Sequence, residues 1–324
     1  MKRRVDWFLV GLVVVSALAF VFPAPGSRGG ALHPELANKL GVALIFLLHG
    51  AALSLAALGE GLRRVRVHIL IQAATFVLFP LLGLSTLLLL PAAWTSNELR
   101  LGLFFLCALP STVSSSVTLT AAARGSVPVA VFNATLSSLL GVVLTPFWIG
   151  LKLKSSGQSL PLGPVILDLL LWLVLPFVVG QCARPLVGAF VARHRRRLGL
   201  LDRATILLLV YTSFCDSVSG GVWTAQSPAA LALTLALCCV LLAAMLLGSS
   251  ALGRALGLAV EDRIALVFCG SKKTLASGVP MARVMFGATP SLGVILLPIL
   301  IYHPLQLVVC GWLASRYARR PAIS

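Results

Sequence analysis

The stretch IALVFCGSKKTLASGVP, residues 264–280, decides the fold. An apolar run from Ile264 ends in a polar run of Ser271, Lys272, Lys273 and Thr274, and a second apolar run follows. Each lysine costs about 2.5 to 3.5 kcal/mol at the centre of a bilayer, so the pair has to face a cavity, a partner or the membrane surface. This pattern predicts a membrane helix interrupted at its middle. The alternative is a short hairpin whose lysines reach the interface.

A second interruption lies between Leu101 and Thr120. The apolar stretch meets Pro110, and seven of the next ten residues carry hydroxyl groups. Proline removes a helix hydrogen-bond donor and clashes with the preceding turn, so we expect a break between Pro110 and Ser114. The freed backbone groups would form an ion or substrate site with the hydroxyls of Ser111, Thr112, Ser114 and Ser115. The alternative is a kinked helix whose hydroxyls bond back to the preceding turn.

The composition places the chain in a membrane. Of 324 residues, 59% are apolar and 11% are charged, whereas a soluble domain carries roughly 25% charged residues. Since a spanning helix needs about 20 apolar residues, the length allows roughly ten spans and no sizeable soluble domain. The apolar windows are Trp7 to Phe22, Leu40 to Leu58, Ile69 to Leu90, Leu99 to Ala123, Val127 to Gly150, Val165 to Leu186, Ala204 to Val222, Ala229 to Leu252, Ile264 to Phe286 and Leu292 to Leu313.

The two interruptions occupy matching places in two halves of five spans. The first half is residues 1–154, residues 155–163 form a polar linker, and the second half is residues 164–324. An odd number of spans per half forces the halves into opposite orientations, as in many transporters built from inverted repeats, where paired interrupted segments mark the midplane binding site. The predicted fold is therefore an all-α integral membrane protein with ten transmembrane helices in two inverted five-helix repeats, broken at helices four and nine.

The formal net charge of +17 sets the orientation. Lys and Arg lie in short segments between apolar runs, which argues against nucleic-acid binding, and most of them fall on one side. The positive-inside rule then places both termini in the cytoplasm of a cell whose inner membrane holds the protein. The first window, Trp7 to Phe22, imitates a secretory signal. Because nine apolar segments follow and no Ala-x-Ala cleavage pattern is present, we expect it to be retained as a span.

Four further polar residues inside the predicted spans are candidate ligands: Gln72, Asn133, Asp216 and His303. Taken singly, an amide or imidazole is as consistent with an interhelical hydrogen bond as with a ligand. Asp216 is the stronger candidate because an unpaired carboxylate in a bilayer is costly. We expect it to pair with Lys272 or Lys273, leaving the other lysine for an anionic substrate. The alternative is that Asp216 binds only local backbone or hydroxyl groups.

Three segments resemble the bile acid:sodium symporter family, and most closely its divergent bacterial branch related to solute carrier 10 member 7. They are Phe268 to Met281, Leu109 to Ser115 and Ile301 to Pro304. The resemblance covers essentially the whole chain. It implies ten spans in two inverted repeats, a panel domain and a core domain, with spans four and nine crossing at their breaks.

The resemblance also implies where sodium ligands would stand. Gln72 and Ser114 keep family positions, whereas Ser115 replaces an Asn, Ala130 and Ala134 replace hydroxyl residues, Phe268 replaces a Glu and Lys272 replaces a Gln. Without the carboxylate that both sodium sites share, the branch is expected to be proton-coupled, uncoupled or not a transporter of bile acids at all. Lys272 suggests a tethered ammonium where a sodium ion would sit.

Two classes of function remain open. The first is a secondary transporter of a small organic anion, such as a bile-acid-like or steroid-conjugate-like compound or another carboxylate or sulfate, with Na⁺, H⁺ or no coupling ion. The anion would meet Lys272 or Lys273 and the N-terminal ends of half-helices. The second is a regulatory membrane protein that keeps the fold without transporting. An enzyme is not expected, because the chain shows neither paired catalytic carboxylates nor a metal motif, and no cofactor is expected.

Overall fold

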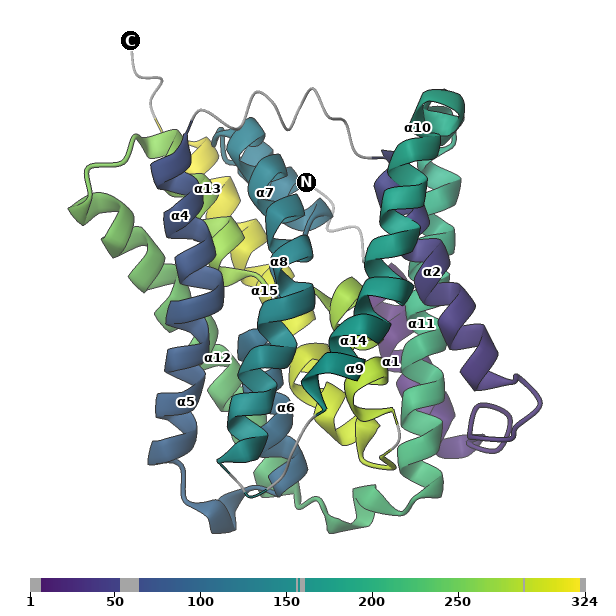
Figure 1. The fold of residues 1–324 in the computed structure, drawn as a ribbon. Coiled ribbons are helices and arrows are strands. Elements are labelled where there is room, and N and C mark those ends of the chain that lie inside the picture. Colours follow the sequence, from purple (N-terminus) through teal and green to yellow (C-terminus); the bar gives the residue numbers. More distant parts are fainter. Residues whose placement is uncertain (1–6, 53–63, 156, 158–160, 288, 321–324) are drawn as a thin grey trace. The chain divides into compact units, whose positions relative to one another are not determined.

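The structure is a computed structural model that describes residues 7–52, 64–155, 157, 161–287 and 289–320. Across these ranges the chain forms helices and their connections, with no strand (Figure 1). The all-α prediction is therefore confirmed. The helices group into two compact units. Unit 1 comprises Met1–Leu53, Ser159–Ser227 and Val279–Leu297, and unit 2 comprises Ser54–Gln158, Pro228–Gly278 and Pro298–Ser324. Each unit thus takes segments from both predicted halves of the sequence.

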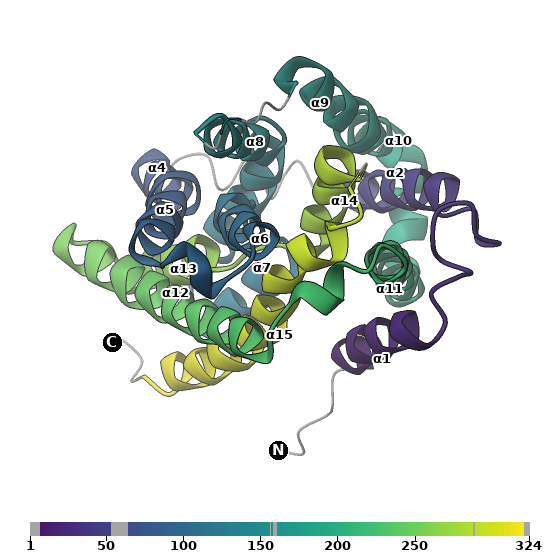
Figure 2. The same cartoon turned by 90° about the horizontal axis from the view of Figure 1, so that it is seen from below.

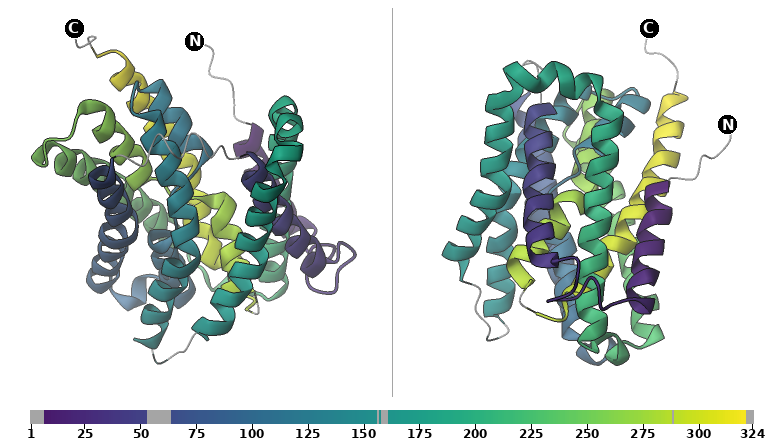
Figure 3. Two further views of the ribbon diagram at one scale, coloured as in Figure 1. Left: turned by 45° about the horizontal axis from the view of Figure 1, so that its top comes forward. Right: turned by 90° about the vertical axis from the view of Figure 1, so that its right-hand side faces the viewer.

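Unit 1 contains the helices α1 (Trp7–Val21), α2 (Pro34–Ala52), α9 (Leu162–Leu169), α10 (Leu175–Arg193) and α11 (Arg195–Ser219). Helix α2 packs beside α10 and α11, as the right-hand view of Figure 3 shows. Glycines permit this approach, because a Cβ atom at Gly50 would overlap the Phe177 carbonyl and one at Gly180 would overlap the Leu47 carbonyl. Small residues at such contacts are typical of helix packing in membranes.

In the described chain, seven further α-helices lie wholly in unit 2. They are α4 (Val65–Ala73), α5 (Phe79–Leu89), α6 (Asn97–Ala108), α7 (Ser114–Ala122), α8 (Val127–Lys154), α12 (Pro228–Ala255) and α13 (Val260–Ser271). The two last helices, α14 (Leu275–Phe286) and α15 (Leu292–Ala318), contribute residues to both units. A π-helical turn, Ala74–Leu78, joins α4 to α5, and Figure 2 shows these helices end on as one coil. A similar turn, Leu170–Val174, joins α9 to α10.

Seven helices in the described ranges are long and apolar enough to cross a bilayer. They are Pro34–Ala52, Val65–Leu89, Val127–Lys154, Leu162–Arg193, Arg196–Ser219, Pro228–Ala255 and Leu292–Ala318. The three other predicted spans coincide with α1, which has 15 residues, and with the divided pairs α6–α7 and α13–α14. Each of these pieces is shorter than the roughly 20 residues that a continuous span needs.

The predicted boundaries were too narrow at several ends. Helix α2 begins at Pro34 rather than Leu40, because proline at a first helical position and an acid in the first turn favour a helix start even where the sequence is polar. Helix α11 begins at Arg195 rather than Ala204, so the basic segment predicted as a connection is largely helical. The end of the predicted second span, Leu53 to Leu58, lies outside the described residues.

Both predicted interruptions are confirmed. Helix α6 ends at Ala108 and α7 begins at Ser114. Helix α13 ends at Ser271 and α14 begins at Leu275, so the lysine pair occupies the gap. A hairpin with lysines at the surface is excluded, because Lys272 and Lys273 are both completely buried.

Candidate functional site at the crossing of two broken helices

The two breaks meet inside unit 2. The backbone N–H of Thr274 donates to the carbonyl of Pro110 at 3.0 Å. The chain approaches closely at this point, since a Cβ atom at Gly278 would lie 2.8 Å from a methyl group of Leu109. The broken segments therefore cross at their interruptions, as the family resemblance implied. Thr274 also accepts a hydrogen bond from the Ser277 N–H at 3.3 Å, so its side chain caps helix α14.

Proline creates unsatisfied carbonyl groups at this crossing. After Ala108 the chain leaves the helix, and Pro110 has no N–H to return to the preceding turn. In the π-helical turn the Phe79 N–H bonds to Ala74, and the next residue, Pro80, cannot donate to the carbonyl of Thr75. A buried carbonyl without a donor costs free energy, so these groups need other partners.

The ammonium of Lys273 is the hydrogen-bond donor for these carbonyl groups. Its Nζ donates to the carbonyls of Leu109 at 2.7 Å, Cys107 at 2.8 Å and Thr75 at 3.0 Å. It also lies 4.2 Å from the ring centroid of Phe79, within the range of a cation–π interaction. The negative end of the α6 dipole faces this charge, which stabilises it further. Lys273 therefore fills the centre of the crossing with a covalently attached cation.

Gln306 of α15 holds the backbone of Lys273 in place. The Lys273 N–H donates to Gln306 Oε1 and Gln306 Nε2 donates to the Lys273 carbonyl, both at 2.8 Å. His303, a predicted site residue, contacts the same amide through Nδ1 at 3.2 Å. Tyr302 donates its hydroxyl to the Ser271 carbonyl at 2.7 Å, while the Ser271 side chain bonds back to Val267 within its own helix. Sequence reasoning missed Gln306, which looks like any isolated span amide.

Lys272 differs sharply from its neighbour. Consecutive side chains in an extended segment point to opposite sides, and Lys272 has extended backbone angles of φ −94° and ψ 144°. Its Nζ is buried and has no hydrogen-bond partner among the described residues. The titratable groups near it in the described chain are the thiols of Cys269 and Cys310. Lys272 Nζ is thus a buried cation without a hydrogen bond or an ion pair among the described residues, an arrangement that costs free energy.

Some of the hydroxyl groups after Pro110 are hydrogen-bonded to one another, and others are not. Thr112 Oγ1 lies 2.7 Å from Ser116 Oγ and accepts from Ser115 Oγ at 2.9 Å. The Ser111 N–H donates to Ser137 Oγ at 2.9 Å, but the Ser111 hydroxyl is buried without a partner. Ser114 is exposed and lies outside this network. The structure thus joins the hydroxyls of two of the four predicted residues, Thr112 and Ser115, through a network that also includes Ser116.

Gln72 and Asn133 lie together on α4 and α8, with His68 as a third member. Gln72 Nε2 donates to Asn133 Oδ1 at 3.0 Å and to the Asn133 carbonyl at 3.2 Å. Asn133 Nδ2 lies 2.7 Å from His68 Nδ1. Gln72 Oε1 is buried without a hydrogen-bond partner in the described chain. His68 was missed from the sequence, although its spacing of four residues from Gln72 places both on one face of a helix.

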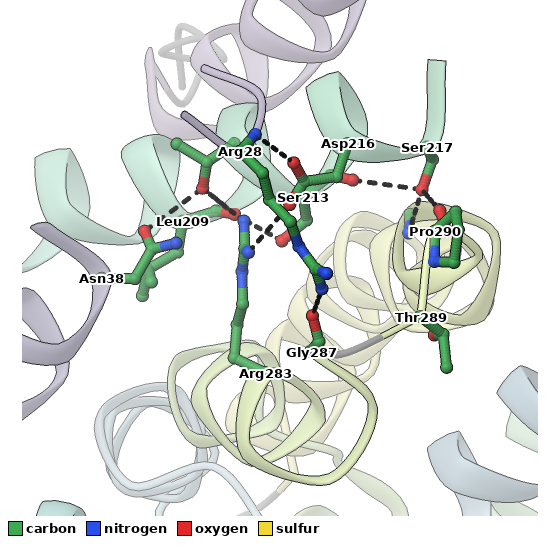
Figure 4. A network of polar contacts seen from close by, with 12 residues as sticks. Arg28, Asn38, Leu209, Ser213, Asp216, Ser217, Arg283, Gly287, Thr289 and Pro290 are labelled. Atoms are coloured by element: carbon green, nitrogen blue, oxygen red, sulfur yellow. Dashed lines mark hydrogen bonds and ion pairs between the residues drawn. The ribbon is translucent and has the colours of Figure 1, made fainter. Parts of the chain in front are cut away.

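Asp216 has a different partner from the predicted one. In unit 1 its carboxylate accepts from Arg283 Nη1 at 3.1 Å and from the backbone N–H of Arg28 at 2.9 Å (Figure 4). Arg283 also donates to Thr212 Oγ1 at 2.6 Å, and the Arg28 side chain donates to the Gly287 carbonyl. The predicted pairing of Asp216 with a lysine is therefore wrong. Lys and Arg were expected in the short segments between the apolar runs, yet Arg283 lies in α14 and is largely buried.

Comparison with known proteins identifies the chain. Residues 6–319 match the model of the SBF-like CPA transporter family. The chain belongs to this family. Among relatives, "Putative symporter YfeH" of Escherichia coli is 39% identical over 98% of this chain and 94% of its own length. Sodium/bile acid cotransporter 7 of Xenopus tropicalis is 32% identical over 97% and 94%, and that of Mus musculus is 32% identical over 97% and 95%.

Family membership confirms the resemblance and fixes the broad class. This SBF-like CPA family protein is a multi-pass membrane transporter. The relatives are named as a symporter and as cotransporters rather than as enzymes. Lys272, which has no hydrogen-bond partner among the described residues, and Lys273, which donates to three carbonyls, therefore belong to a transport protein. In transporters, buried charges at helix breaks are typical of the solute pathway.

Proposed function

We propose that this protein is a secondary transporter of a small organic anion and that it works without sodium coupling. The observation that carries the proposal is the Lys273 ammonium, which the carbonyls of Thr75, Cys107 and Leu109 surround at the crossing of the two breaks. Backbone carbonyls at broken helices bind the coupling cations of many transporters. Here a side chain supplies the cation, so the crossing needs no ion from solution.

The residues at the family's sodium positions do not fit a sodium ion. Phe268 replaces the shared carboxylate, is completely buried and offers no side-chain oxygen. Lys272 brings a positive charge where a neutral amide would coordinate the ion. Two buried ammonium groups next to a further cation would repel it strongly in a medium of low dielectric constant. This set of side chains supports sodium independence.

The same charges favour an anion. Lys272 Nζ and the Ser111 hydroxyl are buried donors without partners among the described residues. Helices α7 and α14 both begin at the crossing, and the N-terminal end of a helix attracts negative charge. A carboxylate or sulfate group would neutralise Lys272 and accept from these donors. The proposed substrates are therefore bile-acid-like or steroid-conjugate-like compounds or other small organic acids, admitted when the transporter opens.

The test is a screen of organic anions against the thermal stability of the detergent-solubilised protein. A ligand that binds only the folded state stabilises it by RT ln(1 + [L]/Kd), about 2.7 kcal/mol at 100 times Kd. We expect carboxylates or sulfates with an apolar body to raise the melting temperature. We also expect the same rise when Na⁺ is exchanged for K⁺ or choline.

Matched lysine variants show whether the effect comes from the crossing. Lys272→Met should abolish the stabilisation, whereas Lys154→Met, which changes an exposed lysine at the end of α8, should preserve it. A saturable requirement for sodium would contradict the sodium-free mechanism. Specific binding without uptake into proteoliposomes would favour the regulatory alternative over transport.

We further propose that the chain crosses the inner membrane ten times, as inverted repeats 1–154 and 164–324 joined by the linker 155–163, with both termini in the cytoplasm. Seven candidate spans, helix α1 and the two divided helices support this count. In a cysteine-free background, cysteines placed at Ser155 and Ser227 should react with an impermeant thiol reagent from the periplasm. One at Gly199 should react only from the cytoplasm, and periplasmic labelling there would overturn the topology.

A further inference from the structure

We infer that the corner between helices α10 and α11 binds the headgroups of anionic phospholipids. Helix α10 ends at Arg193 and α11 begins at Arg195, with only His194 between them. Both helices belong to unit 1, and the right-hand view of Figure 3 shows them joining near its top. The inference goes beyond the proposed function, because it involves neither the helix crossing nor the transported anion.

Arginines are concentrated at this corner. Residues 193–203 read RHRRRLGLLDR, with five arginines and one acidic residue. Arg193, Arg196 and Arg197 are exposed, and their side chains form no hydrogen bond or ion pair with another residue that the structure describes. Three guanidinium groups are therefore available to a ligand with negative charge.

The lengths of the two helices place the corner at the membrane surface. The continuous helix Leu162–Arg193 has 32 residues. At 1.5 Å per residue it is about 48 Å long, whereas the hydrocarbon core is about 30 Å thick and the headgroups extend this to about 40 to 45 Å. The surplus length lies at the Arg193 end, because the apolar run covers Val165 to Leu186. Residues 195–203 likewise precede the apolar part of α11. The arginines therefore lie at the level of the lipid phosphates.

Exposed apolar side chains accompany the arginines. Phe190, Leu200 and Leu201 are exposed on the two helices that meet at the corner. Basic residues interleaved with apolar ones are typical of segments that lie in the interface of an anionic membrane, where the apolar side chains leave water. A soluble anion such as inorganic phosphate would leave these side chains in water. The combination of charge and apolar surface therefore favours a lipid.

Local contacts hold the corner in one shape. The His194 N–H donates to the Phe190 carbonyl at 2.9 Å, and the Leu198 N–H donates to the His194 carbonyl at 3.0 Å. The rings of Phe190 and His194 lie with their centroids 4.2 Å apart. A site that is ordered before binding loses little conformational entropy when a ligand arrives. Because a guanidinium binds a phosphate through two parallel hydrogen bonds, arginines on such a frame suit a lipid phosphodiester.

Native mass spectrometry of the full-length protein in detergent, titrated with one lipid at a time, measures this binding. We expect phosphatidylglycerol to bind more tightly than phosphatidylcholine, whose phosphate is compensated by its own ammonium. The combined change Arg193→Gln, Arg196→Gln and Arg197→Gln should weaken phosphatidylglycerol binding by about tenfold or more, since each basic side chain near an anionic surface contributes to the attraction. Higher ionic strength should weaken the binding of the unchanged protein, because salt screens exposed charges.

Two control variants separate the corner from charge in general. Arg254→Gln, Arg316→Gln and Arg319→Gln together remove the same charge from exposed arginines of unit 2, and this variant should bind phosphatidylglycerol as the unchanged protein does. Lysines at the three corner positions keep the charge, so that variant should retain most of the binding.

Four outcomes would overturn the inference. They are equal binding of the two lipids, equal losses in the corner and control glutamine variants, a lysine variant as weak as the glutamine variant, and displacement of the lipid by excess inorganic phosphate. The screen of organic anions does not involve this corner. The proposed function would therefore survive each of these outcomes, and its own failure would leave the lipid result unchanged.

Discussion

Replacing Lys273 by methionine should lower the free energy of unfolding by about 3 to 5 kcal/mol. The substitution keeps the length of the side chain but leaves the carbonyls of Thr75, Cys107 and Leu109 buried without a donor. Each unsatisfied group costs about 1 to 3 kcal/mol, and part of that cost is offset because a charge is no longer buried. Reversible unfolding in detergent, followed by circular dichroism, measures the difference.

The neighbouring residue provides the matched control. Lys272 is equally buried, but its Nζ has no hydrogen-bond partner among the described residues. Lys272→Met should therefore leave the stability unchanged or raise it by about 1 kcal/mol, because an uncompensated buried charge is removed. Of two adjacent Lys→Met changes, only the one at Lys273 is thus expected to lower the stability. Equal losses in both variants would show that Lys273 does not hold the crossing together.

Replacing Asp216 by asparagine should cost about 3 to 5 kcal/mol, since the change leaves the Arg283 guanidinium buried without its carboxylate. The ion pair measures 3.1 Å, and both side chains are largely buried. Asparagine has nearly the same shape, so the loss reports the charge rather than a cavity. Thermal unfolding of the purified variant measures this effect.

A double-mutant cycle identifies the partner. The variant that combines Asp216→Asn with Arg283→Met should be more stable than the sum of the two single changes predicts, by about 1 to 3 kcal/mol. Asp216→Asn combined with Lys273→Met should show simple additivity, because the carboxylate and the ammonium have separate partners. Coupling to Lys273 instead of Arg283 would restore the pairing that the sequence first suggested.

The helix breaks were predictable because their causes are local. Pro110 removes a donor from its own helix, and the lysines of residues 272–273 cannot lie against lipid wherever the rest of the chain goes. The hydroxyl residues after Pro110 mark the same place. These features depend on neighbours in the sequence, so they can be recognised without knowledge of the tertiary structure.

The partners of the charged groups were not predictable in the same way. Asp216 lies 67 residues from Arg283, and nothing in the local sequence distinguishes that arginine from a cytoplasmic or periplasmic one. The division of roles between Lys272 and Lys273 depends on carbonyls released at Pro80 and Pro110, which come together only in the folded unit. His68 and Gln306 escaped notice because single polar residues in spans are common and their partners lie on other helices.

The cation at the crossing cannot diffuse away, because it is attached to the backbone. A tethered group meets its site at a high effective concentration that the surrounding medium does not change. The carbonyls of Thr75, Cys107 and Leu109 therefore keep their ammonium donor at any salt concentration. If transport is independent of sodium, as proposed, the carrier does not have to bind Na⁺ before it binds its next solute molecule. Its turnover would then depend on the supply of solute and not on the sodium concentration.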